Sequence, residues 1–343
     1  MTTALLPELS IIIVAYDSLN DLKRCLPTVV IASARINHEV IVVDNYGRDN
    51  LGNWLSAHHP AVRYIANAIN TGYAGGNNLG IAQARGKWTF LLNPDTELTP
   101  SSLDQLMDRA RQYPHDFITP KLLNPDGTIN ACGNQMQYTG VTTCRGLNQP
   151  ASAYTVVEEV PLLSGAALLA PTKALRELGS FEETYFMYFE DTDLSLRARL
   201  AGYRLLCEPN SVVTHYYKLG ISPVKFYYLE RNRLLTFFRV FTKSTLRRLL
   251  PALLLTEVLM WGFSLRGMAY IQARFRTYNW LWRNRAIIRQ QHALIQVQRR
   301  VPDQVLLQGS LESMPFDQLI GGKIDTLTNA LLKPIYKLLR PHL

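Results

Sequence analysis

The sequence predicts an α/β fold, in which a mainly parallel, Rossmann-like sheet is flanked by helices and followed by a basic, amphipathic helical region. Short β-branched runs of strand length alternate with segments of helical apolar spacing through the first two thirds of the chain. The runs are apolar at nearly every position, which is typical of parallel strands covered on both faces. Basic residues gather in one C-terminal block, which sets that region apart from the fold before it.

Length and composition limit what the chain can be. The 343 residues allow one large α/β domain with an appendage, and 47% hydrophobic against 18% charged residues exclude a disordered chain. The four cysteines form no CxxC pair and no metal-finger spacing, so we expect buried or free thiols in a reducing compartment. No basic stretch precedes the first apolar run, so we expect no signal peptide and a cytoplasmic protein.

Repeated strand–helix units fill the N-terminal part of the chain. Strands are expected at residues 9–15, 39–43, 62–66 and 88–92, and helices at residues 20–35, 51–58 and 74–85. Gly86 ends the last of these helices. In such sheets ligands bind beyond the carboxyl ends of the strands, so the polar residues that follow each strand are the first candidates for a site.

The middle of the chain is less regular. Residues 123–129 contain a turn signal between two extended pieces, and the composition of residues 140–155 predicts a mobile loop. A helix is expected at residues 190–201, and strands are expected at 203–207 and 212–216. From about residue 224 the pattern is helical and basic, which predicts a first domain over residues 1–223 and a helical region over residues 224–343.

Polar side chains follow three of the predicted strands. Tyr16 follows the first strand, Asp44 ends the second, and Asn93 and Asp95 follow the fourth. Each alone would more often begin a turn or cap a helix. Together at one sheet edge, an aromatic ring and a carboxylate can hold a nucleobase by stacking and hydrogen bonding, and Asp95 can bind a hard divalent cation.

A glycine-rich segment, residues 70–80, precedes one predicted helix. It lacks the Gly-Lys-Ser/Thr ending of a Walker loop and is not a clean dinucleotide fingerprint. Its glycines would let the backbone approach another chain or a phosphate, and a helix N-terminus favours an anion, but a close-packed turn explains them equally well.

Carboxylates crowd the start of the helix expected at residues 190–201. Acidic residues are favoured in the first turn of a helix, which is the plain structural explanation. Glu190 and Asp191 also stand at the mouth of the sheet, where either could serve as general base for a bound hydroxyl. His215 follows a strand and is either a structural histidine or, with Gly220 and Ser222, part of a metal or diphosphate site.

In this order, the motifs resemble those of glycosyltransferase family 2, the inverting nucleotide-sugar transferases of GT-A fold. The resemblance runs from residue 9 to about residue 222 and is strongest to the bacterial rhamnosyltransferase-like branch that builds cell-surface polysaccharides. It rests on Val-Ala-Tyr at 14–16, Val-Val-Asp-Asn at 42–45, residues 70–80, Leu-Asn-Pro-Asp at 92–95, Ser-Gly-Ala at 164–166, residues 190–197, and His215 with Gly220 and Ser222.

The resemblance implies a role for each candidate residue. The donor would be a nucleoside diphosphate sugar, either dTDP-rhamnose or a UDP-sugar, and the acceptor a glycan or a lipid-linked glycan. Asp191 would be the catalytic base, with Glu190 beside it shaping the acceptor site. Asp95 and His215 would bind Mg²⁺ or Mn²⁺. Contacts to the donor would come from Ala15, Tyr16, Asp44, Gly75, Asn77, Asn93 and Asp95.

Three positions depart from the family's pattern. Asn93 stands where the first carboxylate of a DxD-like metal motif is usual, and an amide carries no charge and coordinates weakly. Asp17 stands where Asn is common, and Gly47 where Ser is common.

The chemistry that the resemblance implies fits the residue types. A single displacement inverts the anomeric centre and needs one base, not the two carboxylates of a glycosidase.

Three other functions stay open on the sequence. A sugar-1-phosphate nucleotidyltransferase also uses a nucleotide-binding sheet, but the basic Gly-rich loop that it needs after the first strand is absent. A non-catalytic nucleotide- or membrane-binding scaffold would show no dependence on Asp191. A nucleic-acid binder is suggested only by the basic block, which no recognised nucleic-acid module accompanies, so we expect no nucleic-acid partner.

The basic block is residues 226–300, with 14 basic and 2 acidic side chains. Its most apolar stretch, residues 249–265, is only about as long as the minimum for a membrane span and carries Pro251 and Glu257, so we expect no span there. Arginines interleaved with Trp, Tyr and Leu are typical of helices in a membrane interface. We expect peripheral binding to the anionic inner face of the cell membrane; the alternative is packing on the first domain or in a homodimer.

Overall fold

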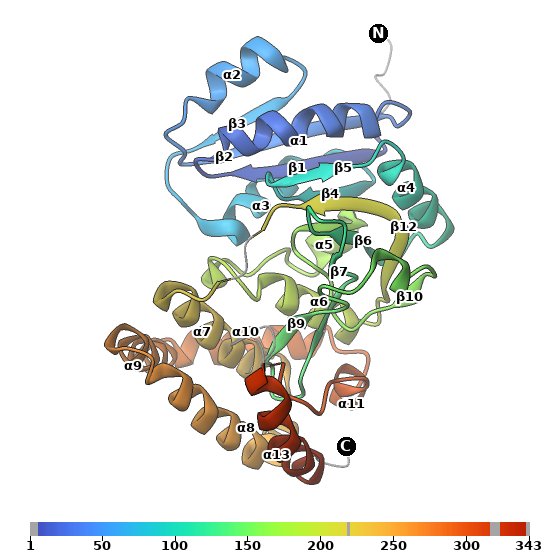
Figure 1. The fold of residues 1–343 in the computed structure, drawn as a ribbon. Coiled ribbons are helices and arrows are strands. Elements are labelled where there is room, and N and C mark those ends of the chain that lie inside the picture. The colour runs from blue at the N-terminus through green and yellow to red at the C-terminus, as the bar shows by residue number, and fades with distance from the viewer. Residues whose placement is uncertain (1–5, 218–219, 316–322, 341–343) are drawn as a thin grey trace. The chain divides into compact units, whose positions relative to one another are not determined.

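The computed structural model describes residues 6–217, 220–315 and 323–340. The chain divides into two compact units, whose elements are labelled in Figure 1. The sheet unit comprises Met1–Gly133, Cys144–Leu194 and Tyr203–Tyr217, and the helical unit comprises Asn134–Thr143, Ser195–Gly202 and Lys218–Leu343. Two short segments that precede residue 223 therefore group with the C-terminal helices.

Ten strands form one sheet in the sheet unit. They are β1 (Leu9–Ala15), β2 (His38–Asn45), β3 (Arg63–Asn67), β4 (Trp88–Leu92), β5 (Thr96–Leu98), β6 (Phe117–Leu123), β7 (Ile129–Ala131), β10 (Glu158–Glu159), β11 (Ala167–Pro171) and β12 (Leu205–His215). Eight follow the order β10-β12-β6-β11-β4-β1-β2-β3, while β5 pairs with β12 and β7 with β6. The block β4-β1-β2-β3 is parallel, as the sequence predicts, and β11 runs antiparallel beside it.

The helices of the sheet unit are α1 (Leu19–Ala32), α2 (Leu51–His58), α3 (Gly72–Gln83), α4 (Ser102–Gln112), α5 (Thr172–Glu177) and the start of α6 (Glu190–Leu200). β1, α2 and β4 have their predicted ends, and α3 begins two residues earlier than expected. Side chains of β1, α1 and α4 pack in one buried cluster that includes Ile11, Ile13, Leu22, Leu26, Leu103 and Leu106. This core holds the strands whose ends carry the candidate site residues.

Two glycines explain how closely α3 approaches the sheet. A Cβ at Gly76 would lie 2.6 Å from Cγ1 of Val14, and a Cβ at Gly80 would lie 2.4 Å from Cγ2 of Ile12. Gly76 and Gly80 are four residues apart, so they lie on the same side of the helix and both face β1. At these two positions the glycines serve close packing.

The middle of the sheet unit is more regular than the sequence predicts. β12 is one strand where two were expected, because it continues through a register shift between Glu208 and Val212. α4 and β5 were not expected. The turn predicted at residues 123–129 is confirmed: it joins β6 to β7, and Asp126 accepts hydrogen bonds from the N–H and the hydroxyl of Thr128.

The prediction of a loop over residues 140–155 is wrong at its start. β8 (Asn134–Met136) and β9 (Thr142–Cys144) form a hairpin, and residues 134–143 belong to the helical unit. Arg233 donates a hydrogen bond to the carbonyl of Thr139 at 3.1 Å. Gly140 packs so tightly that a Cβ there would lie 2.5 Å from the ring of Phe237. These contacts come from residues far along the chain, which local composition cannot show.

The helical unit is built on α7 (Pro223–Val240), α8 (Lys243–Ser264), α9 (Met268–Arg283), α10 (Arg285–Val297), α11 (Asp303–Leu307) and α13 (Lys323–Leu339). Side-chain caps fix two of their starts: Ser222 accepts the N–H of Lys225, and Thr242 accepts the N–H of Thr245. Among the described residues no helix, α8 included, has both the length and the apolar character that a membrane crossing requires.

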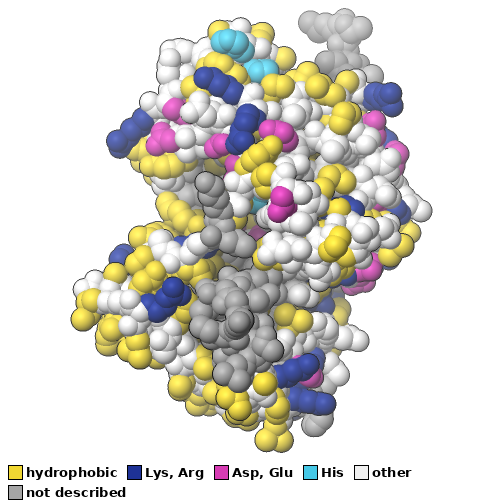
Figure 2. Space-filling model, viewed as in Figure 1, with side chains coloured by type: hydrophobic (Ala, Val, Ile, Leu, Met, Phe, Trp, Pro, Cys, Tyr) yellow, Lys and Arg dark blue, Asp and Glu magenta, His cyan; other side chains and the backbone are white. Residues whose placement is uncertain are grey.

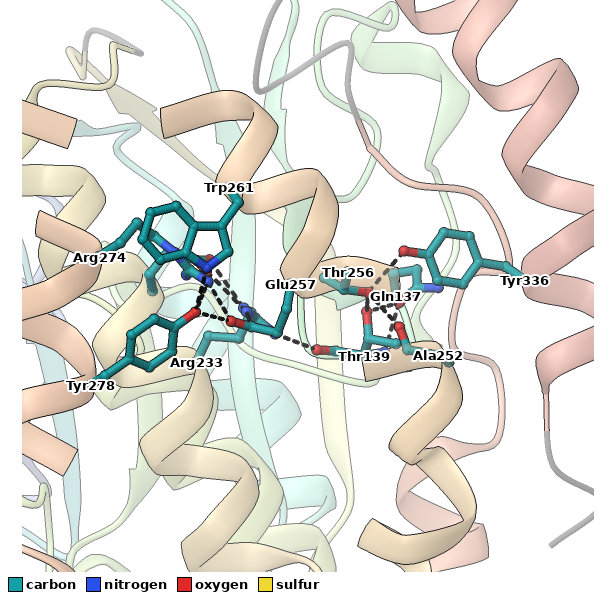
Figure 3. A network of polar contacts seen from close by, with 11 residues as sticks. Gln137, Thr139, Arg233, Ala252, Thr256, Glu257, Trp261, Arg274, Tyr278 and Tyr336 are labelled. Carbon is teal, nitrogen blue, oxygen red and sulfur yellow. Dashed lines mark hydrogen bonds and ion pairs between the residues drawn. The ribbon is translucent and has the colours of Figure 1, made fainter. Parts of the chain in front are cut away.

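A buried network of charged side chains joins α7, α8 and α9 (Figure 3). Arg233 of α7 and Arg274 of α9 each bond to both Glu230 of α7 and Glu257 of α8. Tyr278 donates its hydroxyl to Glu257 at 2.5 Å. Glu230 and Glu257 are the two acidic residues of the basic block, and their side chains are only 6% and 19% exposed. Both are bonded to these arginines, so they do not neutralise the cations at the surface.

A second polar cluster, visible on the right of Figure 3, holds the hairpin. Thr256 of α8 bonds to the hydroxyls of Thr139 and Tyr336, each at 2.8 Å. Tyr138 donates its hydroxyl to the backbone carbonyl of Tyr336 at 2.5 Å. The hairpin, α8 and α13 are therefore held together by hydrogen bonds that water cannot reach.

Candidate active site

The strand ends that the sequence singled out meet at one edge of the sheet. β1 lies between β4 and β2, and the register places Ala15 opposite Asp44 and Ile13 opposite Leu92. Residues that follow three adjacent parallel strands, Tyr16, Asp44 and Asn93 among them, therefore stand beyond the same edge. The side chain of Tyr16 is 49% exposed, so its ring is accessible to a ligand.

Asp44 is a buried carboxylate held by two donors. Its Oδ1 accepts the N–H of Gly47 at 2.7 Å, and its Oδ2 accepts the hydroxyl of Tyr64 at 2.7 Å. Burial and the neighbouring carboxylate raise the pKa of Tyr64 to about 12, so Tyr64 stays a donor at neutral pH. A Cβ at Gly47 would lie 2.7 Å from Oδ1 of Asp44, so a serine there would displace the carboxylate.

A cavity of about 560 Å³ opens beside Asp44, and Gly47, Arg48, Asn50 and Tyr64 also line it. Its volume falls in the range of small-molecule sites. A carboxylate offers roughly four lone-pair positions, so Asp44 can accept a further hydrogen bond from a ligand in addition to its two present ones.

Asn45, the residue after Asp44, fixes the glycine-rich segment to β2. Its Nδ2 donates to the carbonyl of Gly72 at 2.9 Å and to Oδ1 of Asn70 at 3.1 Å. Its Oδ1 accepts the N–H of Thr71 at 3.1 Å. Asn45 was not among the predicted site residues, although its place in the Val-Val-Asp-Asn motif was a signal for a role.

Gly75 and Asn77 lie in the first turns of α3 and are buried. The Nδ2 of Asn77 donates to the carbonyl of Tyr73 at 2.9 Å. A Cβ at Gly75 would lie 2.5 Å from Cβ of Thr71. Both residues thus have local packing roles, and their contact with a donor stays a prediction.

Asp95 and His215 lie side by side because β5 pairs with β12, which places His215 opposite Thr96. Nε2 of His215 is 3.4 Å from Oδ1 of Asp95, and neither atom has a hydrogen-bond partner among the described residues. The same holds for the buried Oδ1 of Asn93. Buried polar atoms without a partner are costly, so these three atoms are available to bind a ligand.

These atoms fit a divalent cation. Oxygen and imidazole ligands suit Mg²⁺ and Mn²⁺, which often bind through one or two protein side chains and complete their shell with phosphates. In the part of the chain that the structure describes, no group of three or more His, Cys, Asp or Glu side chains gathers as a cation site. A cation held by Asp95 and His215 would therefore need further oxygen ligands from a bound molecule.

Asn130 orients His215, and the sequence did not single it out. Nδ1 of His215 lies 3.2 Å from Oδ1 of Asn130, which can only accept, so Nδ1 carries a proton and Nε2 is the ring nitrogen that faces Asp95. The Nδ2 of Asn130 donates to Oδ1 of Asn124 at 2.8 Å, which fixes the orientation of the amide. Asn130 reaches His215 because β7 folds back on β6. The sequence around Asn130 carries no pattern that predicts this contact.

Glu190 and Asp191 begin α6, and their carboxyl groups have different surroundings. Asp191 accepts the N–H of Gly165 at 2.8 Å and the N–H of Thr192 at 2.7 Å. Oε2 of Glu190 is buried and has no hydrogen-bond partner among the described residues. Burial raises the pKa of Asp191, and burial together with the charge of Asp191 raises the pKa of Glu190 well above its usual value.

Tyr73 connects α3 to these carboxylates. Its hydroxyl donates to the carbonyl of Gly165 at 2.5 Å. Burial raises the pKa of Tyr73 well above its usual value, and the charges of Glu190, Asp191 and Asp95 add to the effect. Gly165 also donates its N–H to Asp191, and the carbonyl of the residue after it accepts the N–H of Asn93, so the start of α6 and the end of β4 lie close together.

The segment that leads into α6 is strained. Phe186, Tyr188 and Phe189 have φ values of 64°, 64° and 70°, a left-handed region that aromatic residues rarely adopt. Gly72, with φ of 71°, packs against this segment so closely that a Cβ would lie 2.2 Å from the carbonyl oxygen of Phe186. Strain of this kind gathers at functional sites, and here it directly precedes the two carboxylates.

Comparisons with known proteins agree with the fold. The family model described as Glycosyl transferase family 2 matches residues 10–177. An N-acetylglucosaminyl-diphospho-decaprenol L-rhamnosyltransferase of Mycobacterium tuberculosis is 29% identical over 61% of this chain and 76% of its own. The low-salt glycan biosynthesis hexosyltransferase Agl10 of Haloferax volcanii is 27% identical over 70% and 78%. The rhamnosyltransferase WbbL of Escherichia coli is 24% identical over 60% and 82%.

Solved structures show the same fold at low sequence identity. GalNAc-T7 with UDP, GalNAc and Mn²⁺ superposes with a TM-score of 0.56 at 17% identity, over 70% of this chain and 49% of its own. S. aureus TarS 1–349 in complex with UDP-GlcNAc superposes with a TM-score of 0.55 at 17% identity, over 78% and 79%. The predicted GT-A fold is thereby confirmed. The family match, the relatives and the fold together show a glycosyltransferase that is similar to glycosyl transferase family 2 over residues 10–177.

Proposed function

We propose that this enzyme moves a sugar from a nucleoside diphosphate, with inversion, to a hydroxyl of a glycan or lipid-linked acceptor during synthesis of a cell-surface polysaccharide. The observation that carries the proposal is that Gly165 bonds to both Tyr73 and Asp191 while the next residue accepts the N–H of Asn93, so that the start of α6 and the end of β4 meet at one site. Two of the relatives named above are rhamnosyltransferases, and the name of one includes a diphospho-decaprenol acceptor. Rhamnose on dTDP is therefore the first donor to test, and UDP-sugars are the second.

The donor nucleoside is assigned to the edge of β1 and β2. The ring of Tyr16, next to Ala15, stacks on the base, and Asp44 accepts an N–H of the base with its remaining lone pairs. Gly75 and Asn77 line the side formed by α3. Asn93 and Asp95 face the diphosphate, where the orphaned Oδ1 of Asn93 gains a partner.

Asp95 and His215 are assigned to a divalent cation shared with the diphosphate. His215 presents Nε2 because Asn130 holds its other nitrogen protonated. When bound, Mg²⁺ or Mn²⁺ supplies Lewis-acid stabilisation of the negative charge that forms on the departing diphosphate. Asn93 is neutral, so Asp95 is the one carboxylate of this motif that offsets the positive charge of the cation, where a DxD motif would supply two.

Asp191 is assigned as the general base. Gly165 and Thr192 hold its carboxylate in one orientation, and its raised pKa makes it a better proton acceptor than an exposed aspartate. The acceptor oxygen bonds to the anomeric carbon as the bond from that carbon to the phosphate oxygen breaks. The electron pair leaves with the nucleoside diphosphate, the acceptor proton passes to Asp191, and the configuration inverts. Burial raises the pKa of Glu190 well above its usual value, and in its protonated form Glu190 donates a hydrogen bond to the acceptor.

The test is incubation of the full chain with a panel of nucleoside diphosphate sugars and a polyprenyl-diphosphate-linked saccharide acceptor, scoring release of the nucleoside diphosphate. We expect release from dTDP-rhamnose or a UDP-sugar that requires the acceptor, stops in excess chelator, and returns with Mn²⁺ or Mg²⁺. Release of pyrophosphate from a nucleoside triphosphate and a sugar 1-phosphate would instead identify a nucleotidyltransferase. Donor binding without any turnover, unchanged in Asp191→Asn, would identify a scaffold.

A further inference from the structure

An apolar cavity of about 570 Å³ lies among α7, α8, α9 and α10 of the helical unit. Its apolar lining is Phe238, Phe241, Leu246, Leu281, Trp282 and Ile288. Phe238 and Trp282 are 44% and 65% exposed, so large aromatic surfaces face solvent at its mouth. We call this cavity the helical-unit groove. None of its lining residues belongs to the candidate active site.

Basic side chains surround the helical-unit groove. Lys243, Arg285, Arg289 and His292 complete its lining. Lys243, Arg285 and Arg289 are exposed, and none of the three has an ion pair with a carboxylate within residues 220–315 and 323–340 or elsewhere in the described chain. The only carboxylates of the basic block, Glu230 and Glu257, are held inside by Arg233 and Arg274. The groove therefore combines an apolar interior with an uncompensated positive rim.

Further apolar side chains are exposed on the same unit. Leu250, Leu254 and Val258 of α8 recur every four residues and are 50%, 57% and 66% exposed. Figure 2 shows hydrophobic side chains gathered over the surface of the helices of this unit. An apolar surface with interspersed arginines matches helices that lie in the headgroup region of a bilayer.

We propose that the helical-unit groove binds an anionic phospholipid and docks the helical unit on a bilayer. One acyl chain packs against Phe238, Leu281 and Trp282, while Lys243, Arg285 and Arg289 bind phosphate groups of the headgroups. Charge complementarity selects this occupant, because Lys243, Arg285 and Arg289 have no carboxylate partner among the described residues and most of the lining between them is apolar. The proposal concerns this groove alone and does not depend on the transfer reaction.

The first test is flotation of the full chain with vesicles of phosphatidylcholine, with and without phosphatidylglycerol. We expect flotation only with phosphatidylglycerol, and less of it at high salt. The variant R285Q/R289Q should bind about 30-fold more weakly, at about fivefold for each charge removed near the surface. The matched control is R35Q/K173Q, which removes two side chains of the sheet unit that are 86% and 87% exposed and should float like the unmodified chain.

The second test asks whether a chain enters the groove. Vesicles with brominated acyl chains should quench the tryptophan fluorescence of the unmodified protein, and Trp282→Phe should remove most of this quenching while the protein still floats. Trp282→Ala should also weaken flotation, whereas Ile31→Ala, at an exposed apolar position of α1, should not.

Four results would overturn the proposal. The chain could stay in the soluble fraction with phosphatidylglycerol vesicles at low salt. The groove variants could float like R35Q/K173Q, or the quenching could survive Trp282→Phe, and either result would place membrane contact elsewhere. Light scattering without lipid could also give the mass of a dimer that Trp282→Ala converts to a monomer, and the groove would then be an interface between two copies of the chain.

Discussion

Asp191 and Glu190 are neighbours in sequence but differ in what their oxygens contact. Both oxygens of Asp191 accept backbone N–H groups, which favour its charged form, while Oε2 of Glu190 has no partner in the described chain. Burial acts on both, and Asp191 adds its charge to the burial of Glu190. The pKa of Glu190 therefore lies well above its ordinary value, whereas two backbone donors oppose the rise at Asp191, which separates their chemical roles.

The first prediction follows from this separation. Asp191→Asn should keep the fold and donor affinity but lower turnover by roughly two to four orders of magnitude, the range for a lost general base. Turnover and donor affinity are measured separately by initial rates and by calorimetric titration with the donor. Glu190→Gln is the matched comparison and should keep more activity, because an amide can still donate a hydrogen bond. If Glu190→Gln loses turnover and Asp191→Asn keeps it, the two roles are exchanged.

The second prediction concerns stability and pH at Glu190. Its pKa is raised in the folded chain, so between its ordinary value and the folded value the native state holds a proton that the unfolded state has lost. Stability therefore falls as pH rises through this window, and below it the group contributes nothing. Glu190→Gln removes the ionisable group and with it this loss of stability. The Tm of the variant, measured by differential scanning fluorimetry, should be a few degrees higher at pH 8 but hardly changed at pH 4. Glu177→Gln, at an exposed carboxylate, is the control and should show no such pH dependence.

The third prediction concerns Asn130, which contacts His215 and not the predicted cation itself. Asn130→Ala should weaken Mn²⁺ binding about 10- to 100-fold, the usual effect of losing the partner that orients a ligating histidine. Binding is measured by calorimetry in the presence of the nucleoside diphosphate, so the readout does not depend on turnover. Asn130→Asp keeps an acceptor for Nδ1 of His215 and should restore affinity. Equal weakening in both variants would mean that Asn130 acts on the packing alone.

At the scale of elements, the sequence predicted the parallel block well and its surroundings less well. β1, β4 and α2 were found because a continuous apolar run or an amphipathic period is a local property. β12 was divided in two because Pro209-Asn210 looks like a turn, whereas its pairing with β6 carries the strand across this point. The β8–β9 hairpin was missed because its partners, Arg233, Thr256 and Tyr336, are far away in sequence.

The site shows the same division between local and long-range information. Tyr16, Asp44, Asp95 and Asp191 follow strands or begin a helix, so a rule about strand ends finds them. Asn130 and the bond from Tyr73 to Gly165 depend on strands that pair across the sheet, and no local pattern marks them.

The fourth prediction tests the packing of α3 on β1. Gly76→Ala places a Cβ 2.6 Å from Val14, so α3 must move away, and we expect a loss of about 1–3 kcal/mol in the free energy of unfolding. Because α3 carries Tyr73 and the predicted donor contacts, donor affinity should fall as well. The control is Gly262→Ala in α8, where a Cβ meets nothing within 4 Å and should stabilise by up to about 1 kcal/mol. Urea denaturation measures both.

At the scale of the whole molecule, charge separates the two units. The net charge of +9 reflects the basic block, whose two carboxylates are turned inward. Glu257 was expected to argue against a membrane span, and the structure shows what it does instead: it bonds to Arg233, Arg274 and Tyr278. Burial alone would raise the pKa of Glu257, but the two arginines hold it below its usual value, so the carboxylate stays charged inside the helical unit.

The last prediction is that Glu257→Ala destabilises the helical unit by about 3–5 kcal/mol, because removing one partner of a buried ion pair leaves the other charges uncompensated. The control is Glu312→Ala, which breaks the half-exposed pair with Arg340 in the same unit and should cost at most about 1 kcal/mol. Both are measured by urea denaturation followed by tryptophan fluorescence, since Trp261 lies against the network. The pKa of Glu257 is lowered, so its contribution is present above its ordinary value and is lost as pH falls through the folded value. The difference between the two variants should therefore shrink in acid; a difference that is constant with pH would mean that Glu257 acts by shape and not by charge.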